Sequence, residues 1–256
     1  MIPILFKIGP IRVGSYGLMM ALAFLTTGWL LQREFVRKKF PGDWAYTIVT
    51  AAAIGGIVGA RLYFIFEHWG MFLRDPLGLI FTGSGLTWYG GLIGGVAAVI
   101  WVVHRFSASN LEVLDLVAPL VLLGYGIGRI GCLLAGDGDY GPPTNLPWGM
   151  AFPHGLVPTT VPVHPTPLYD TLLSWALFAV LWKWRKRPHP PGFMISGMLV
   201  FYGIERFITE FWRTTPKILF GWMSMAQILS IVSILVGIGF GWWLLKHKQP
   251  GWQKMA

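Results

Sequence analysis

The stretch from Val113 to Ala135 reads VLDLVAPLVLLGYGIGRIGCLLA, an apolar run interrupted by Asp115 and Arg129. A helix of about 20 mostly apolar residues is long enough to cross a bilayer. Across the chain of 256 residues, 54% are hydrophobic and 12% are charged. That charged fraction is about half of the roughly 25% usual in a soluble domain. The composition predicts a polytopic membrane protein and excludes a cytosolic enzyme, a disulfide-stapled secreted domain and a disordered chain.

Seven segments have the length and composition of membrane spans, which predicts an all-α protein with seven transmembrane helices in one domain, residues 1–256. The spans cover residues 13–31, 47–66, 86–103, 113–135, 168–184, 192–211 and 225–245. Residues 136–167 are rich in Pro, Gly and Thr and predict an exterior loop region. Glycines spaced by four, such as Gly55 with Gly59 and Gly90 with Gly94, predict close packing of helices.

The positions of lysine and arginine predict the orientation in the membrane. Twelve of these 20 residues fall on the side of the C-terminus and five on the side of the N-terminus. Cytoplasmic loops carry an excess of cations, so we expect the C-terminus in the cytoplasm and the N-terminus outside. The net charge of +9 therefore reflects membrane anchoring, and no nucleic-acid partner is expected.

The three remaining cations, Arg61, Arg129 and Arg206, lie inside predicted spans, where an arginine costs about 2.5–3.5 kcal/mol. Counted from the predicted starts of their spans, all three lie roughly 21–24 Å along a path of about 30 Å. Separate interfacial residues or structural ion pairs would explain each one alone. The matched depth, with Glu205 and Glu210 nearby, favours one polar cavity at the outer leaflet. Guanidinium groups there would suit an anionic ligand such as a phosphate.

Other polar residues reach the same level from the spans that run inward. They are Ser15, Tyr16, Trp88, Tyr89 and residues 164–170. His164 would serve there as an acid or base, because a histidine ring titrates near neutral pH. Alternatively, it would cap the helix that follows it.

The glycine-rich segment after Ala135 predicts that the helix ends and that irregular backbone lies beside Arg129. Asp137 and Asp139 read as solvated turn residues rather than as a cation site, since two aspartates are a weak metal signal. No metal and no cofactor are expected. Cys132, one turn beyond Arg129, reads as a packing residue more readily than as an activated thiol.

Short motifs follow one another in order along the chain. They are Ile8-Gly-Pro with Tyr16-Gly-Leu-Met, Gly59-Ala-Arg61-Leu-Tyr, Tyr89-Gly-Gly-Leu-Ile-Gly-Gly, Ala118-Pro-Leu, Gly128-Arg129-Ile-Gly with Gly136-Asp137, His164-Pro-Thr with Leu168-Tyr169, Tyr202-Gly with Arg206, Glu210-Phe-Trp-Arg213, and Ser224-Met-Ala-Gln227-Ile-Leu-Ser. In this order they resemble the prolipoprotein diacylglyceryl transferase family over nearly the whole chain. Each motif alone is weak, and their shared order makes the resemblance strong.

The resemblance implies a seven-helix enzyme of the bacterial plasma (inner) membrane whose active site faces the outer leaflet. Such an enzyme takes the diacylglyceryl unit of phosphatidylglycerol and releases glycerol phosphate. The acceptor is the thiol of the lipobox cysteine in a prolipoprotein signal peptide, in the first step of lipoprotein maturation. The expected partners are therefore phosphatidylglycerol, prolipoprotein signal peptides and the bilayer.

By the same resemblance, Arg129 and Arg206 are the two required arginines, and Glu210 is the carboxylate near the second. Two guanidinium groups would stabilise the charge that grows on a leaving phosphate. The residues expected to bind substrate are Tyr16, Arg61, Cys132, Asp139, Tyr169, Glu210, Arg213 and Gln227.

The chain departs from the family where a histidine usually assists deprotonation of the thiol, because Tyr89 stands at that position. Cys132 also replaces the usual asparagine. The candidates for the base are Tyr89, Asp137, Asp139 and His164. The alternative to a transferase is a diverged membrane protein that binds or transports a lipid or anion without catalysis.

Overall fold

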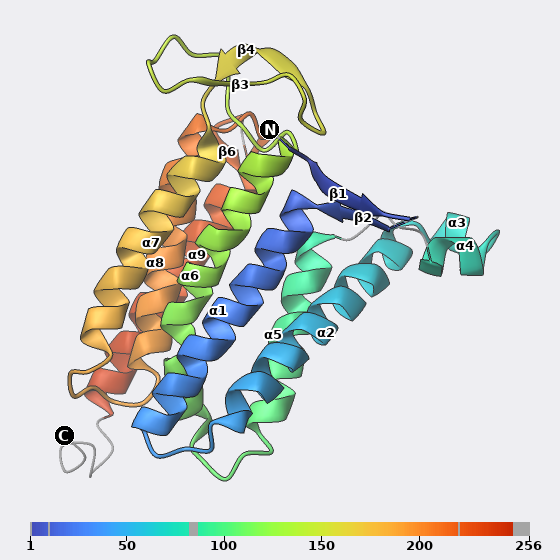
Figure 1. Ribbon diagram of the computed structural model, residues 1–256. Coiled ribbons are helices and arrows are strands. Elements are labelled where there is room, and N and C mark those ends of the chain that lie inside the picture. Colours follow the sequence, from blue (N-terminus) through green and yellow to red (C-terminus); the bar gives the residue numbers. More distant parts are fainter. Residues whose placement is uncertain (1, 10, 82–86, 220, 248–256) are drawn as a thin grey trace. The chain divides into compact units, whose positions relative to one another are not determined.

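The computed structural model describes residues 2–9, 11–81, 87–219 and 221–247 (Figure 1). Each of the seven predicted spans overlaps one helix. These helices are α1 (Ser15–Arg37), α2 (Asp43–Glu67), α5 (Trp88–Val103), α6 (Asn110–Ala135), α7 (Thr166–Trp184), α8 (Phe193–Thr209) and α9 (Met225–Lys246). By length and composition α2, α6 and α9 can cross a membrane, and α5 is a shorter apolar helix. The structure therefore supports a helical membrane protein, and the number of spans stays a prediction.

The remaining elements are short. They are the helices α3 (Trp69–Phe72) and α4 (Pro76–Phe81), the 3-10 helix η1 (Glu210–Trp212), and three antiparallel hairpins: β1 (Ile4–Ile8) with β2 (Ile11–Gly14), β3 (Met150–Phe152) with β4 (Thr159–Val163), and β5 (Lys217–Leu219) with β6 (Met223–Ser224). The all-α prediction missed these hairpins, because strands this short show too little alternation to be recognised from sequence.

Several predicted boundaries also shift. Arg37, predicted in a loop, lies in the last turn of α1, where its Nη2 makes an ion pair of 2.6 Å with Glu34 Oε2. An ion pair between residues three apart favours continued helix. Glu210 was predicted inside a span and instead begins η1. The predicted start of the third span at Leu86 and the predicted tail cations Lys248 and Lys254 lie outside the described residues.

The chain divides into two compact units, which are described separately. The first comprises Met1–Thr27 and Leu114–Ala256, and the second comprises Gly28–Val113. In the second unit α2 and α5 pack closely against each other. A Cβ added at Gly59 would lie 2.3 Å from the carbonyl oxygen of Gly90, which is far too close. The predicted packing of helices through spaced glycines is thus confirmed for this pair.

In the first unit, α6, α7 and α8 share a buried apolar core. Its fully buried members are Ala118, Leu122, Leu181 and Met194. Ser174 Oγ on α7 donates a hydrogen bond of 2.7 Å to the carbonyl oxygen of Leu122 on α6. Helices α8 and α9 lie side by side along their length (Figure 1). These contacts hold the four helices that carry the site residues described below.

The acidic residue near the start of α6 has a structural partner. Asp115 is buried, and its carboxylate accepts hydrogen bonds from the backbone N–H groups of Gly192 at 2.7 Å and Ile195 at 3.0 Å. The first N–H groups of a helix have no partner within the helix, and a carboxylate there also complements the helix dipole. Asp115 therefore caps α8, which explains why a charge is retained in an otherwise apolar stretch.

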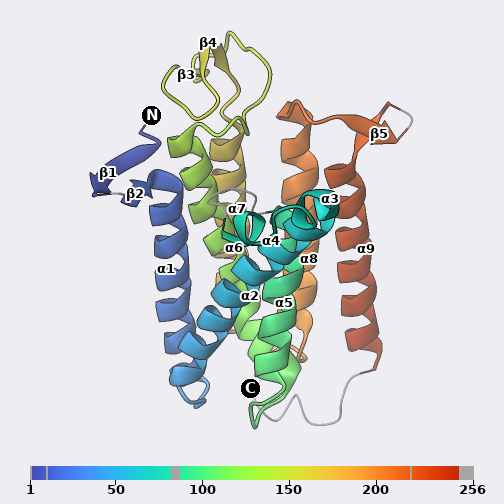
Figure 2. The ribbon, with the colours of Figure 1, turned by 90° about the vertical axis from the view of Figure 1, so that its right-hand side faces the viewer.

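At the opposite end of α6 the backbone breaks as predicted. The helix ends at Ala135, and Gly136 and Gly138 adopt positive φ angles of 60° and 95°. Glycine adopts this conformation without steric cost. The β3–β4 hairpin and the segment from η1 to β5 lie at this same end of the first unit (Figure 2). The predicted loop region 136–167 therefore lies beside the last turns of α6.

Candidate functional site

Arg129 is the centre of a buried polar cluster in the first unit. Its side chain lies six residues before the end of α6 and is almost completely buried. Arg129 Nε donates a hydrogen bond of 2.7 Å to Asp170 Oδ2 on α7, and its Nη1 pairs with Asp139 Oδ2 in the following loop. The same Nη1 contacts Cys132 Sγ at 3.2 Å. Three segments thus hold one guanidinium group in a defined orientation.

Asp139 connects this arginine to a second one. Arg213, which follows η1, places its Nη2 2.7 Å from Asp139 Oδ2 and 3.6 Å from Asp170 Oδ2. Burial raises the pKa of Asp139, but the guanidinium groups of Arg129 and Arg213 outweigh this effect and lower the pKa to about 2. A carboxylate with so low a pKa is a weak proton acceptor. Asp139 is therefore suited to hold the two arginines in place rather than to act as the base.

Arg206 on α8 has its own carboxylate partner. Its Nη2 lies 2.9 Å from Glu210 Oε2, and Glu210 is fully buried. Thr215 Oγ1 donates a hydrogen bond to Glu210 Oε1. Asp170 is an electrostatic neighbour of both Arg206 and Arg129, so the two arginines belong to one cluster. The structure thus brings together two of the three arginines that were predicted to share a polar cavity, and the third, Arg61, belongs to the second unit.

Several guanidinium donors in the cluster remain free. Arg129 Nη2, Arg206 Nη1 and Arg213 Nε are buried, and no hydrogen-bond acceptor among the described residues reaches them. Buried N–H donors are almost always paired in folded proteins, so three such donors require an explanation. An anion with several oxygen atoms would satisfy them.

A cavity opens beside the cluster at the loop end of the first unit. Its volume is about 190 Å³, and its lining includes Asp139 and Arg213. The other lining residues are Gly138, Tyr140, Thr214, Thr215 and Pro216. Arg213 and Asp139 are therefore reached from the end of the helices that carries the loop region 136–167.

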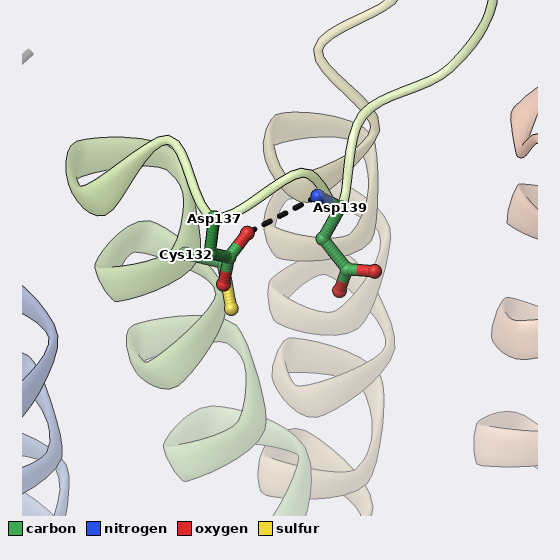
Figure 3. A group of neighbouring side chains, drawn as sticks. All are labelled: Cys132, Asp137 and Asp139. Carbon is green, nitrogen blue, oxygen red and sulfur yellow. Dashed lines mark hydrogen bonds between the residues drawn. The ribbon is translucent and has the colours of Figure 1, made fainter. Parts of the chain in front are cut away.

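The turn after α6 brings together three groups of the kind that bind cations. Figure 3 shows Cys132, Asp137 and Asp139, whose potential ligand atoms all lie within 4.8 Å of one another. The backbone N–H of Asp139 donates to Asp137 Oδ1 at 3.2 Å, which is the hydrogen bond of an Asx turn. Arg129 Nη1 contacts Cys132 and Asp139 and already supplies a positive charge. The geometry thus supports the predicted turn.

His164 lies in a set of aromatic side chains that also contains Trp148, Tyr169 and Trp212. His164 Nδ1 lies 3.2 Å from Tyr169 Oη, and Trp148 Nε1 donates to the same hydroxyl at 2.9 Å. The ring of Trp212 packs edge-on against Tyr169. Pro165, which precedes α7, makes no side-chain cap, and the backbone oxygen of His164 accepts a hydrogen bond of 2.9 Å from the N–H of Thr166 at the start of α7. The role of His164 as an acid or base stays a prediction.

Tyr16 and Gln227 occupy different surroundings in the first unit. Tyr16, at the start of α1, is an electrostatic neighbour of Arg129, Cys132 and Asp137. Its predicted role in substrate binding stays a prediction. Gln227 instead completes a capping box at the start of α9. Its N–H donates to Ser224 Oγ at 3.3 Å, and its Oε1 accepts from the N–H of Ser224 at 3.1 Å. The observed role of Gln227 is thus structural.

Arg61 and Tyr89 belong to the second unit. Arg61 Nη1 donates to the carbonyl oxygen of Leu79 at 3.3 Å, and its guanidinium lies over the ring of Phe64. Tyr89 is partly exposed, with its ring edge-on to that of Trp88. The predicted participation of Arg61 and Tyr89 in the cluster around Arg129 stays a prediction.

Two residues of the cluster were not predicted as site residues. Asp170 and Glu205 are both fully buried. The sequence did contain a signal for them, because each is an ionisable residue in a largely apolar helix. Burying such a group in a membrane span costs free energy, and these residues commonly have a function. Arginines dominate the charge pattern of the sequence, and for that reason the pattern gives these two residues only as neighbours of the site.

Comparisons with known proteins identify the family to which the chain is similar. The family model for prolipoprotein diacylglyceryl transferase matches residues 3–243. A phosphatidylglycerol--prolipoprotein diacylglyceryl transferase of Pseudomonas putida is 38% identical over 96% of this chain and 95% of its own. The proteins of the same name from Pseudomonas fluorescens and Photobacterium profundum are each 36% identical, over 97% and 95% of this chain and 95% and 93% of their own.

Proposed function

Because the chain belongs to the prolipoprotein diacylglyceryl transferase family, we propose that it transfers the diacylglyceryl group of phosphatidylglycerol to the lipobox cysteine of prolipoproteins. The observation that carries this proposal is the set of free, buried donors on Arg129, Arg206 and Arg213. A phosphodiester is a single anion with several acceptor oxygens, and arginine binds it with geometric specificity.

In the proposed reaction the thiolate attacks the glyceryl carbon that bears the phosphate. A C–S bond forms, the C–O bond breaks, and its electron pair stays on the oxygen of the released glycerol phosphate. The thiol proton passes to a base before the attack, since the thiolate is the nucleophile. Arg129 and Arg206 stabilise the negative charge that grows on the leaving phosphate, and their fixed orientation requires little rearrangement.

The base is proposed among Tyr89, Asp137 and His164. Of these, His164 already has a hydrogen-bonding partner in Tyr169 that orients its ring. Asp137 adjoins the Arg129 cluster through the turn after α6. Tyr89 stands where relatives of the family carry a histidine. Asp139, the fourth candidate, is a poor base because its pKa is about 2.

We propose seven spans in the bacterial inner membrane, with the N-terminus outside and the arginine cluster at the outer leaflet. The excess of lysine and arginine on the side of the C-terminus supports this orientation. Arg129 and Arg206 both lie within the last two turns of their helices, α6 and α8. A cluster at that level gives the phosphate of an outer-leaflet lipid direct access to the guanidinium groups.

A peptide assay tests the proposed function. The purified protein is mixed with phosphatidylglycerol and a peptide that carries a lipobox, and the peptide is analysed by mass spectrometry. We expect a mass increase of one diacylglyceryl unit, and no increase when the peptide cysteine is replaced by serine. Binding of the lipid without any peptide modification would instead support the lipid-binding alternative.

A further inference from the structure

Glu205 is a buried carboxyl group that the proposed transfer leaves unused. It lies on α8 and is fully buried. Neither of its carboxyl oxygens has a hydrogen-bond donor among the described residues. The adjacent Arg206 pairs with Glu210 instead. An ionised carboxylate buried without a hydrogen-bond donor is strongly unfavourable, so Glu205 requires an explanation.

Asp170 supplies that explanation. Glu205 lies within hydrogen-bonding reach of Asp170. Asp170 Oδ2 accepts from Arg129 Nε, whereas Asp170 Oδ1 has no donor. Two carboxyl groups form a hydrogen bond only when one of them carries a proton, and two like charges so close would repel each other. A proton on Glu205 would turn one of its oxygens into the missing donor.

The charges of the cluster support the same arrangement. The three arginines are matched by three carboxylates, Asp139, Asp170 and Glu210. A negative charge on Glu205 would add an unpaired charge to this cluster and would oppose the binding of a phosphate. With Glu205 neutral, the carboxylates that are ion-paired to the arginines match them in number.

The ionisable groups around Glu205 lie on three helices. They are Tyr125 and Arg129 on α6, Asp170 on α7, and Tyr202 and Arg206 on α8. Helix α9 also packs along α8, and it carries no ionisable side chain from Met225 to Leu245. Among the described residues, Asp170 is therefore the carboxyl group that is placed to accept a hydrogen bond from Glu205.

We propose that Glu205 is protonated and donates a hydrogen bond to Asp170, so that Asp170 holds Arg129 in position for an anionic phosphodiester. Glu205 is thus a positioning residue, acting on the substrate through two other side chains. This inference rests on the proposed function for its substrate. The protonation of Glu205 does not depend on that function and is tested separately.

Infrared spectroscopy tests the protonation without any assay of activity. A protonated carboxylic acid shows a carbonyl stretch that a carboxylate lacks. We expect the spectrum of the wild type minus that of Glu205→Gln to contain this band at neutral pH. The matched control is Glu67→Gln, which removes an exposed carboxylate at the end of α2 and should leave the acid band unchanged. Absence of the band from the Glu205→Gln difference would overturn the proposal.

Transfer kinetics test the positioning. Glu205→Gln keeps a neutral side chain with N–H donors, and we expect its KM for phosphatidylglycerol to stay within about threefold of the wild type. Glu205→Leu keeps the bulk but removes the donor, and we expect its KM to rise by about tenfold or more. At alkaline pH the KM of the wild type should rise as Glu205 ionises, whereas that of Glu205→Gln should stay flat.

Equal losses in Glu205→Gln and Glu205→Leu, or an alkaline rise of KM that persists in Glu205→Gln, would refute the positioning role. Size-exclusion chromatography and circular dichroism of both variants establish that they are folded. If the wild type transfers no lipid, the proposed function fails, and the infrared band still decides whether Glu205 carries the proton.

Discussion

Arg129 and Asp170 lie 41 residues apart in the chain and form a buried ion pair in which Nε and Oδ2 are 2.7 Å apart. The pair links α6 to α7 near the loop end of the first unit. It also occupies one edge of the guanidinium group and leaves Nη2 free for a ligand. We therefore expect stability and the proposed phosphate binding to depend on the same contact.

Replacement of Asp170 by asparagine should destabilise the protein. Removal of one partner from a buried ion pair typically costs about 3–5 kcal/mol, because the other charge stays buried. We expect a lower midpoint of thermal unfolding in detergent, followed by circular dichroism. The control Asp43→Asn changes an exposed carboxylate on α2 and should melt like the wild type. An unchanged midpoint in Asp170→Asn would show that the pair adds no stability.

Replacement of Arg129 or Arg206 by lysine should impair lipid transfer. Arg129→Lys and Arg206→Lys keep the positive charge but lose the planar set of donors that binds a phosphate. We expect kcat/KM for lipid transfer to fall by at least about 100-fold in each, as when a donor to a developing charge is removed. Arg74→Lys, at an exposed position after α3, is the matched control. Wild-type activity in Arg129→Lys would rule out specific recognition of phosphate by that residue.

Tyr89 can be tested as the proton acceptor by two substitutions. Tyr89→Phe removes only the hydroxyl, and we expect transfer to slow by about 100-fold, a typical loss when an acid or base is removed. Tyr89→His introduces a better base at neutral pH and should retain activity. Trp88→Phe, at the neighbouring exposed ring, controls for changes in packing. Full activity in Tyr89→Phe would leave Asp137 and His164 as the candidates.

The ion pairs of Asp139 should make the protein sensitive to acid. Its pKa falls from the ordinary value of 3.8 to about 2 in the folded protein, so its stabilising contribution is present above about pH 4. That contribution is lost as the pH falls from 4 towards 2 and the carboxylate takes up a proton. Thermal unfolding at several pH values should show a smaller loss over this range in Asp139→Asn than in the wild type. Equal losses in both would contradict this assignment.

The contact between α2 and α5 should not tolerate a side chain at Gly59. A Cβ there would lie 2.3 Å from the carbonyl oxygen of Gly90, and overpacking of this kind typically costs about 1–3 kcal/mol. We expect Gly59→Ala to lower the thermal midpoint. Gly239→Ala on α9 is the control, because a Cβ at that position meets no atom within 4 Å. A midpoint equal to that of the wild type in Gly59→Ala would mean that the helices separate without cost.

Much of the fold followed from local patterns. Long apolar runs predicted the positions of the seven long helices, and the glycines after Ala135 predicted the end of α6. The hairpins were missed because they contain few residues. The family resemblance implied a substrate contact for Gln227, and the structure shows that this residue forms a helix cap with Ser224. A capping box is also a sequence pattern, so this cap could have been predicted, and the substrate contact of Gln227 stays a prediction.

The sequence by itself determined that this is a membrane protein, which family it resembles, and that Arg129 and Arg206 lie near the ends of their helices. Hydropathy and charge are properties of neighbouring residues, and they can be read without a fold. Only the tertiary structure decided that Asp170 and Asp139 bind Arg129, and that Glu205 lies beside Asp170 without a donor. A hydrogen bond requires that the distance between donor and acceptor be correct to within a few tenths of an ångström, and here the two residues are far apart in the chain. Packing of the helices sets those distances, and no local pattern records them.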